Sequence, residues 1–187
     1  MAGTRDARER ILGATAELVT VGGLDAATPA AIAERAGAGK MSLYRHFSGK
    51  DELVAEALAD RDLDLRAWLI GDPADRTPRE RLLALFDRVA RRADRGGGSY
   101  IGCPYVSARL NVPDGAHPVA PVVVAHKDGM LRELGALLTE IGVADPEQKA
   151  QAVLMLLDGA VVHSVIRGNG DPLRAACAAL PGLISAR

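Results

Sequence analysis

The amino-acid sequence predicts an all-α protein of about nine helices. Apolar residues recur at intervals of three and four along most of the chain, which is the period of an amphipathic helix. Proline and glycine stand at the ends of these segments, where helices begin and stop. The one conceivable strand, at 121–124, lies inside a longer helical pattern. With 187 residues the chain is long enough to bury a core.

The first three predicted helices are short and closely spaced. The first covers 4–21 and ends at Gly22-Gly23, and its apolar positions are Ala7, Ile11, Ala14, Leu18 and Val21. Thr28 caps the second helix and Pro29 fits its first turn, and this helix ends at Gly37. The third covers 40–46.

The next three helices carry local start and stop signals. Ser48 is expected to cap the fourth, with Asp51 as a weaker substitute for the glutamate of a capping box, and the helix ends at 71–73. Thr77-Pro78 starts the fifth helix, which ends in the glycine run 96–98. The sixth follows Cys103-Pro104 and ends near 111–113.

The last three helices are longer and more apolar. They are expected at 118–141, 146–167 and 172–185, with Pro181 bending or breaking the ninth. The eighth is apolar on most faces around 152–157. A helix that is apolar all round needs more than one neighbour, and in a chain of this size a second subunit could provide it.

Charge excludes a uniformly basic nucleic-acid binder but leaves room for a local basic patch. The chain has 23 Lys and Arg against 24 Asp and Glu, a net charge of -1. Residues 1–50 carry seven basic and five acidic side chains, a net of +2, which leaves 16 and 19 for the remainder, a net of -3. The asymmetry has the sign expected if the N-terminal segment meets nucleic acid.

Several function classes lack their signals in this sequence. No uninterrupted apolar run has the length of a membrane span, and the charged N-terminus is unlike a signal peptide, so a cytoplasmic location is expected. The four histidines and two cysteines have no metal-ligand spacing. No nucleophile elbow, phosphate loop or dinucleotide fingerprint occurs. We therefore expect no metal, no cofactor and no enzyme activity.

The most informative segment, 28–50, reads TPAAIAERAGAGKMSLYRHFSGK. Two short helices joined by a tight turn at Gly37 predict a helix-turn-helix, in which apolar residues of both helices face each other and the second helix points outward. Thr28 and Lys50 flank the unit at helix N-termini, which are phosphate sites. The outward groups of the second helix suit phosphates and base edges, and they come from Lys40, Met41, Ser42, Tyr44, Arg45 and His46.

This segment resembles the DNA-binding domain of the TetR family of bacterial transcriptional regulators. The resemblance covers about residues 5–58 and rests on Thr28, the run IAERAG at 32–37, the run LYRHF at 43–47, and Lys50 followed by Glu52-Leu53. Three positions depart from the common pattern. Gly39 stands where a capping serine is frequent, a departure that costs only a few tenths of a kcal/mol. Met41 stands where a small residue is usual and Arg45 where histidine is usual, and these two point to a change in the bases read.

The resemblance implies a role for each matching residue and a division of the chain. Residues 1–49 would form the DNA-binding domain, and residues 50–187 an all-helical effector-binding and dimerisation domain. Thr28, Tyr44 and Lys50 would hold phosphates, while Lys40, Met41, Ser42 and Arg45 would face the major groove. Tyr44 could instead be a partly buried core aromatic, and His46 could only cap or pack the helix end.

Residues of the second domain are assigned with alternatives left open. Candidates for a small-molecule cavity are Trp68, Phe86, Val89, Cys103, Tyr105, Val106, Leu110, Val123, Lys127, Met130, Met155 and Asp158. Cys103 could instead be a redox sensor, and Asp158 could face a ligand, pair across a dimer or reach solvent. By the resemblance, the eighth and ninth helices would form a four-helix bundle with their mates through Val153, Leu156, Leu157, Ala160, Val161, Leu173, Ala176, Cys177 and Leu180, which could also be core residues.

Together these features predict a homodimeric transcriptional repressor that a small-molecule effector releases from a palindromic double-stranded DNA operator. The alternative is a helical small-molecule-binding or enzymatic domain that does not read DNA. An activator is a third possibility, because the position of the operator decides between the two kinds of regulation.

Overall fold

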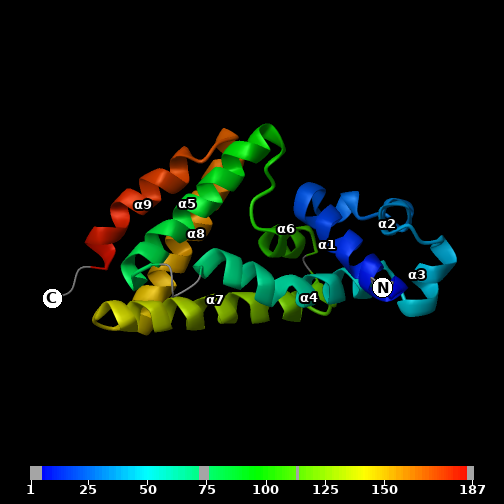
Figure 1. The fold of residues 1–187 in the computed structure, drawn as a ribbon, viewed down its shortest axis with the longest axis horizontal. Coiled ribbons are helices and arrows are strands. Elements are labelled where there is room, and N and C mark those ends of the chain that lie inside the picture. Colours follow the sequence, from blue (N-terminus) through cyan, green and yellow to red (C-terminus); the bar gives the residue numbers. More distant parts are fainter. Residues whose placement is uncertain (1–5, 72–75, 113, 185–187) are drawn as a thin grey trace. The chain divides into compact units, whose positions relative to one another are not determined.

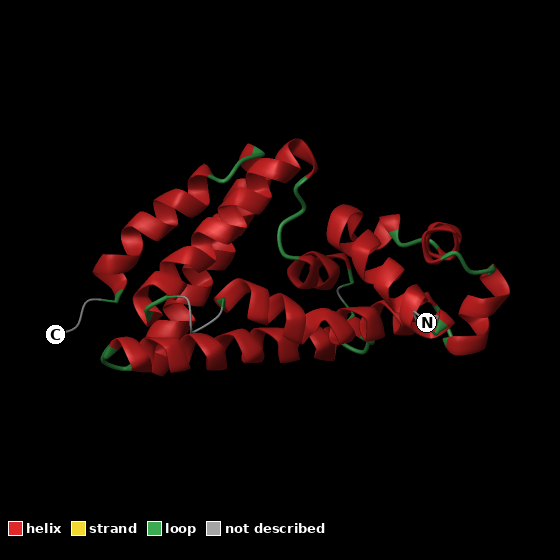
Figure 2. Ribbon diagram, in the orientation of Figure 1, coloured by secondary structure: helices red, strands yellow, loops and turns green. Residues whose placement is uncertain are grey.

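The computed structural model describes residues 6–71, 76–112 and 114–184, and these ranges hold nine α-helices and no strand (Figures 1 and 2). The all-α prediction is confirmed. The helices are α1 Ala7–Ala26, α2 Pro29–Ala36, α3 Lys40–His46, α4 Lys50–Ile70, α5 Pro78–Gly96, α6 Pro104–Asn111, α7 Val119–Ile141, α8 Pro146–Arg167 and α9 Asp171–Leu183, with a 3-10 turn at Gly97–Ser99. The predicted helix limits at Thr4, Asp72-Pro73, Pro113 and Ser185 lie outside the described residues.

The chain folds into two compact units. The first unit runs to Asp62 and includes Cys103–Val124, and the second combines Leu63–Gly102 with the residues from Ala125 onward. Helices α4 and α7 each continue from one unit into the other. These are units of packing, so the functional boundary after residue 49 stays a prediction.

In the first unit, α1 packs against α2, α3 and α6. Ile11, Ile32 and Leu58 are almost fully buried among these helices. Tyr105 of α6 is also buried, and its hydroxyl donates a hydrogen bond of 2.7 Å to the carbonyl of Leu58. The glycine stop predicted for the first helix is a kink, because Gly23 has φ 71° and ψ -167° and one more helical turn follows it.

In the second unit, α5, α8 and α9 pack against one another. Leu82, Leu85 and Phe86 of α5 and Leu173 and Leu180 of α9 have no measurable exposure. This small three-helix core explains why α5 repeats apolar residues at helical spacing.

Two helix ends differ from the sequence prediction, and one agrees with it. Thr77 and Glu80 form the capping box at the start of α5. Helix α4 begins at Lys50, so Gly49 and not the predicted Ser48 directly precedes its first residue. Ser48 donates from its backbone N–H (2.8 Å) and its hydroxyl to Glu52, so its acidic partner is Glu52 and not Asp51. Helix α9 continues through Pro181 to Leu183, because a proline in the last turn forfeits little of the hydrogen-bond ladder.

Helix α8 has an unusual composition for its position. Among the described residues it is the one helix long and apolar enough to cross a membrane by length and composition, a test that core helices of soluble proteins also pass. Met155, Val162, Val165 and Ile166 of α8 remain exposed in the isolated chain. The helix therefore has an apolar face that its own chain does not cover.

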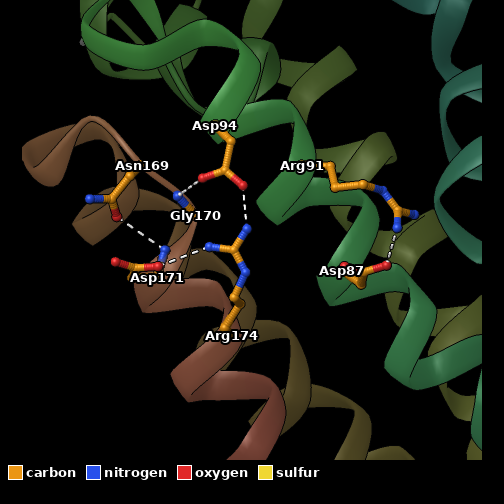
Figure 3. Close-up of polar contacts among 7 residues, drawn as sticks. All are labelled: Asp87, Arg91, Asp94, Asn169, Gly170, Asp171 and Arg174. Atoms are coloured by element: carbon orange, nitrogen blue, oxygen red, sulfur yellow. Dashed lines mark hydrogen bonds and ion pairs between the residues drawn. The ribbon is translucent and has the colours of Figure 1, made fainter.

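Asp94 fastens the end of α5 to the start of α9 (Figure 3). One carboxylate oxygen accepts the backbone N–H of Gly170 at 2.7 Å, and the other accepts a hydrogen bond from the guanidinium of Arg174. Arg174 also donates to Asp171 at 2.9 Å. The bond from Arg174 and then the one from Gly170 hold the pKa of Asp94 below its ordinary value.

This lowered pKa predicts an acid-sensitive contact. A carboxyl whose pKa falls on folding stabilises the folded state above its unfolded pKa, and this contribution is lost as pH falls through the folded value. We expect Asp94→Asn to destabilise the protein at neutral pH and to reduce the loss of stability below about pH 4. Urea unfolding of both proteins across the acid range measures this, and parallel stability–pH curves would contradict it.

Candidate nucleic-acid interface

Local hydrogen bonds hold both the start of α2 and the turn between α2 and α3. Thr28 caps α2, and its hydroxyl oxygen accepts the N–H of Ala31 at 3.2 Å. At the other end Gly37 adopts φ 59° and ψ 40°, a left-handed conformation that favours glycine. The N–H groups of Gly37 and Ala38 then bond to the carbonyls of Glu34 and Ala33. This glycine fixes the direction in which α3 leaves the turn.

Helix α3 buries one side and exposes the other. Leu43 and the following Phe47 are 4% exposed and pack into the first unit. The opposite side bears the predicted DNA-binding residues: Lys40, Met41, Tyr44 and Arg45 are exposed, while Ser42 and His46 are half-buried. Tyr44 is 59% exposed, so its hydroxyl and ring are on the surface and not in the core.

The end of α3 is held by an aromatic contact. The guanidinium of Arg8, from α1, lies 5.3 Å from the centre of the Phe47 ring, and Arg8 also forms an ion pair with Glu56 of α4. The ring of His46 meets Phe47 edge-on at 6.4 Å. The helix that carries the exposed groups is thus fixed to its neighbours at its C-terminal end.

Lys50, predicted as a phosphate ligand, has a contact that the sequence did not reveal. Its ammonium donates a hydrogen bond of 2.9 Å to the carbonyl of Leu24, in the last turn of α1. An ammonium has three protons, so this bond leaves donors for a phosphate. On the next residue, Asp51 lies 3.3 Å from His117, whose Nδ1 accepts the N–H of Val119. The start of α4 is therefore fixed on two sides.

Comparison with known proteins identifies the family. The family described as bacterial regulatory proteins, tetR family, matches residues 11–57, and the tetracyclin repressor-like C-terminal domain matches residues 115–186. The chain belongs to the TetR family. It is a DNA-binding transcription regulator with an N-terminal helix-turn-helix, and the resemblance drawn from the sequence is confirmed.

One relative of this TetR-family regulator matches it over most of its length, and a second matches it over about half. The HTH-type transcriptional regulator YjdC of Escherichia coli is 25% identical over 168 residues, which cover 88% of this chain and 86% of YjdC. The repressor KstR of Rhodococcus jostii is 35% identical over 91 residues, 49% of this chain and 42% of KstR.

Solved structures extend the likeness to the whole fold. A TetR-type regulator from Streptomyces avermitilis has a TM-score of 0.81 at 28% identity and covers 98% of this chain and 100% of its own. Another, from Streptomyces coelicolor, has a TM-score of 0.79 at 26% identity and covers 95% of this chain and 88% of its own.

The predicted effector-cavity residues of the regulator are divided between the two units. Cys103, Tyr105, Val106, Leu110 and Val123 belong to the first, and Trp68, Phe86, Val89, Lys127, Met130, Met155 and Asp158 to the second. Phe86, Val89, Tyr105, Val123 and Met130 are buried, whereas Leu110 and Met155 are 75% and 68% exposed. Their role in binding an effector stays a prediction.

Asp158 has a partner that the sequence analysis did not foresee. The ammonium of Lys127, on α7, donates to both of its carboxylate oxygens, at 2.6 and 2.7 Å. The pair is half-buried and lies within one chain, so Asp158 needs no dimer partner to balance its charge. The two residues are 31 positions apart, and no local pattern could have joined them.

Most of the predicted dimer residues lie inside the regulator's own core. Val153, Leu157, Ala160, Val161, Leu173, Ala176 and Leu180 are less than 9% exposed, while Leu156 and Cys177 are half-buried. The Cys177 thiol approaches the carbonyl of Leu83 at 3.8 Å, and burial raises its pKa. The exposed residues of α8 include a stripe at helical spacing, Gln151, Met155, Gly159, Val162 and Ile166, which we call the α8 stripe.

The phosphate role of Lys50 gives a testable expectation. Lys50→Ala should weaken binding to all DNA sequences about equally and reduce the slope of log K against log salt by about one, because one phosphate contact is lost. Lys50→Gln should show the same change in slope but a smaller loss of thermal stability, since its amide can still bond to Leu24. Fluorescence anisotropy over a salt series measures the slope. An unchanged slope in both variants would rule out the phosphate contact.

Proposed function

We propose that this regulator is a homodimeric repressor that leaves a palindromic operator when a small-molecule effector binds. The observation that carries the DNA part of the proposal is the exposed side of α3. Lys40, Tyr44 and Arg45 lie together there on a helix that the Gly37 turn and the Phe47 contacts fix in place. Cations and hydroxyls on such a surface suit phosphates and base edges.

The α8 stripe supports the dimer part of the proposal. Its members are spaced four, four, three and four residues apart, so they share one face of the helix. The exposed residues of the adjacent α9 include the small Ala175, Ala178, Ala179 and Gly182, besides Asp171, Arg174 and Pro181. A two-fold axis through this surface would let two α8 stripes meet face to face, with small residues allowing close approach.

A dimer of this kind implies a particular operator. Two recognition helices entering successive major grooves lie about 34–36 Å apart, so the operator should be a palindrome with half-sites one turn apart. Release requires that the effector favour a state in which DNA binds less well. The coupling is typically about 1–3 kcal/mol, and DNA must weaken effector binding by the same factor.

The effector part of the proposal rests on the second unit. Its core is mostly apolar with a few buried polar side chains, and Lys127 and Asp158 form a half-buried ion pair in the same unit. Such a combination suits an apolar ligand with one polar end. We further propose a cytoplasmic, non-enzymatic protein, in line with its family; Cys103 is kept as a residue near the cavity, with redox sensing as the second role.

In vitro selection from random duplex DNA tests this function. A recovered palindrome with half-sites about one turn apart would support a dimeric repressor, and its position relative to a promoter would distinguish repression from activation. Failure to enrich any sequence at low salt, with the protein folded and dimeric, would overturn the sequence-specific operator.

A further inference from the structure

Met41 stands out on the surface of α3. It is 78% exposed, more than any other large apolar side chain that the described residues expose. Arg45 lies one helical turn further along the same side, and Tyr44 is its exposed neighbour. The core contacts of α3 come from Leu43 and Phe47 on the other side, so Met41 contributes nothing to the packing of the first unit.

The chemistry of methionine restricts what Met41 can read. Its thioether has no N–H or O–H donor, and its sulfur is a weak acceptor, so it cannot form the paired hydrogen bonds by which arginine or asparagine selects a base. The edges of the bases in the major groove are polar except at one place. The 5-methyl group of thymine is the apolar group there, and an exposed flexible apolar chain is its natural partner.

We propose that Met41 is a specificity-determining residue that selects a thymine in each half-site through its 5-methyl group. Arg45, on the same side, selects a different base pair of the half-site by hydrogen bonds. This inference rests on the proposed function, because it requires that the exposed side of α3 enters the major groove. It adds to that function a chemical requirement on the operator.

The test removes one methyl group from each half-site of the DNA. Each thymine of the duplex recovered by in vitro selection is replaced, one symmetric pair at a time, by uracil, which pairs identically but lacks the 5-methyl group. For the unmodified full-length protein, one pair of positions should weaken binding by about four-fold per half-site, the value of one buried methyl group. In Met41→Ala the same replacement should have no effect.

Arg45→Ala serves as the matched control. This variant should bind both the original duplex and every uracil-substituted duplex more weakly than the unmodified protein does. The critical uracil replacement should still reduce its affinity by the same factor, since Arg45 does not touch the methyl group. Met41 is exposed, so thermal unfolding of Met41→Ala should match that of the unmodified protein.

The outcomes separate the inference from the proposed function. If selection recovers no sequence, the operator itself fails, and the inference falls with it. If a palindrome is recovered but uracil is harmless at every thymine, or Met41→Ala remains as sensitive as the unmodified protein, the methyl contact is wrong while the operator stands. A recovered palindrome whose half-sites contain no thymine would likewise show that the methyl contact is wrong while the operator stands.

Discussion

Val162→Asp should convert the regulator into a monomer and reduce its affinity for the operator by more than about 100-fold. Val162 belongs to the α8 stripe and is 48% exposed in the isolated chain, so we expect the substituted chain to keep its fold. Because the proposed interface is two-fold, each of the two subunits would bury one new carboxylate, at a cost of several kcal/mol per ion. A monomer binds only one half-site at a time, so the affinity that the dimer gains by binding both half-sites together is lost. Analytical ultracentrifugation and operator titration measure the two effects.

Leu110→Asp is the matched control for this substitution. Leu110 is 75% exposed, but it lies on α6 in the first unit, whereas the α8 stripe belongs to the second. We expect this variant to remain a dimer at every concentration at which the unmodified protein is one. A dimeric Val162→Asp protein would show that the α8 stripe is not the interface.

Gly170→Ala should have the largest effect on stability among the substitutions considered. A Cβ atom at this position would lie 2.5 Å from the carbonyl oxygen of Ala90 and 2.9 Å from its Cα. These are backbone atoms of α5, which cannot turn aside as a flexible side chain can. The start of α9 would have to move, and the N–H bond of Gly170 to Asp94 would lengthen. Overpacking of this kind costs about 1–3 kcal/mol, which thermal unfolding would register as a drop of several degrees in Tm.

Gly135→Ala makes the same chemical change where there is room. Gly135 lies within α7, in the same unit, and among the described residues no atom beyond its chain neighbours and its own turn of helix backbone lies within 4 Å of a Cβ added there. Alanine has the higher helix propensity, so this variant should gain up to about 1 kcal/mol. Equal changes in Tm for the two variants would mean that the contact with Ala90 does not govern Gly170.

Local signals in the sequence predicted the helices well, because their causes are local. Thr77 and Pro78, which predicted the start of α5, are its N-cap and first helical residue in the structure, where Glu80 adds the second half of a capping box. The contact of Lys50 with Leu24 and that of Lys127 with Asp158 join distant positions, and no spacing rule indicates them. At the start of α4, two acidic residues stood side by side, and only the structure shows which one faces Ser48.

The choice of residues on α8 shows a second limit of sequence reasoning. The helix is apolar on nearly all sides, so its pattern could not say which apolar side faces inward. In the structure Val153, Leu157 and Val161 pack within the chain, whereas Val162 and Ile166 point out of it. On α3, by contrast, Leu43 is the one buried apolar residue, and Lys40, Met41, Tyr44 and Arg45 are exposed as predicted, whereas Ser42 and His46 are half-buried.

The packing of α6 against α1 has a practical consequence for hybrid regulators. An engineer who transplants residues 1–49 onto a foreign sensor would leave α6 behind, and with it the buried ring of Tyr105. The graft would then expose to solvent the apolar surface of α1 that α6 covers in the native chain. A transplant built from the first unit as a whole, residues 1–62 together with 103–124, would include α6 and so keep this surface of α1 buried. The first unit, which carries the helix-turn-helix, is thus assembled from two separate stretches of chain, and a single boundary after residue 49 would divide it.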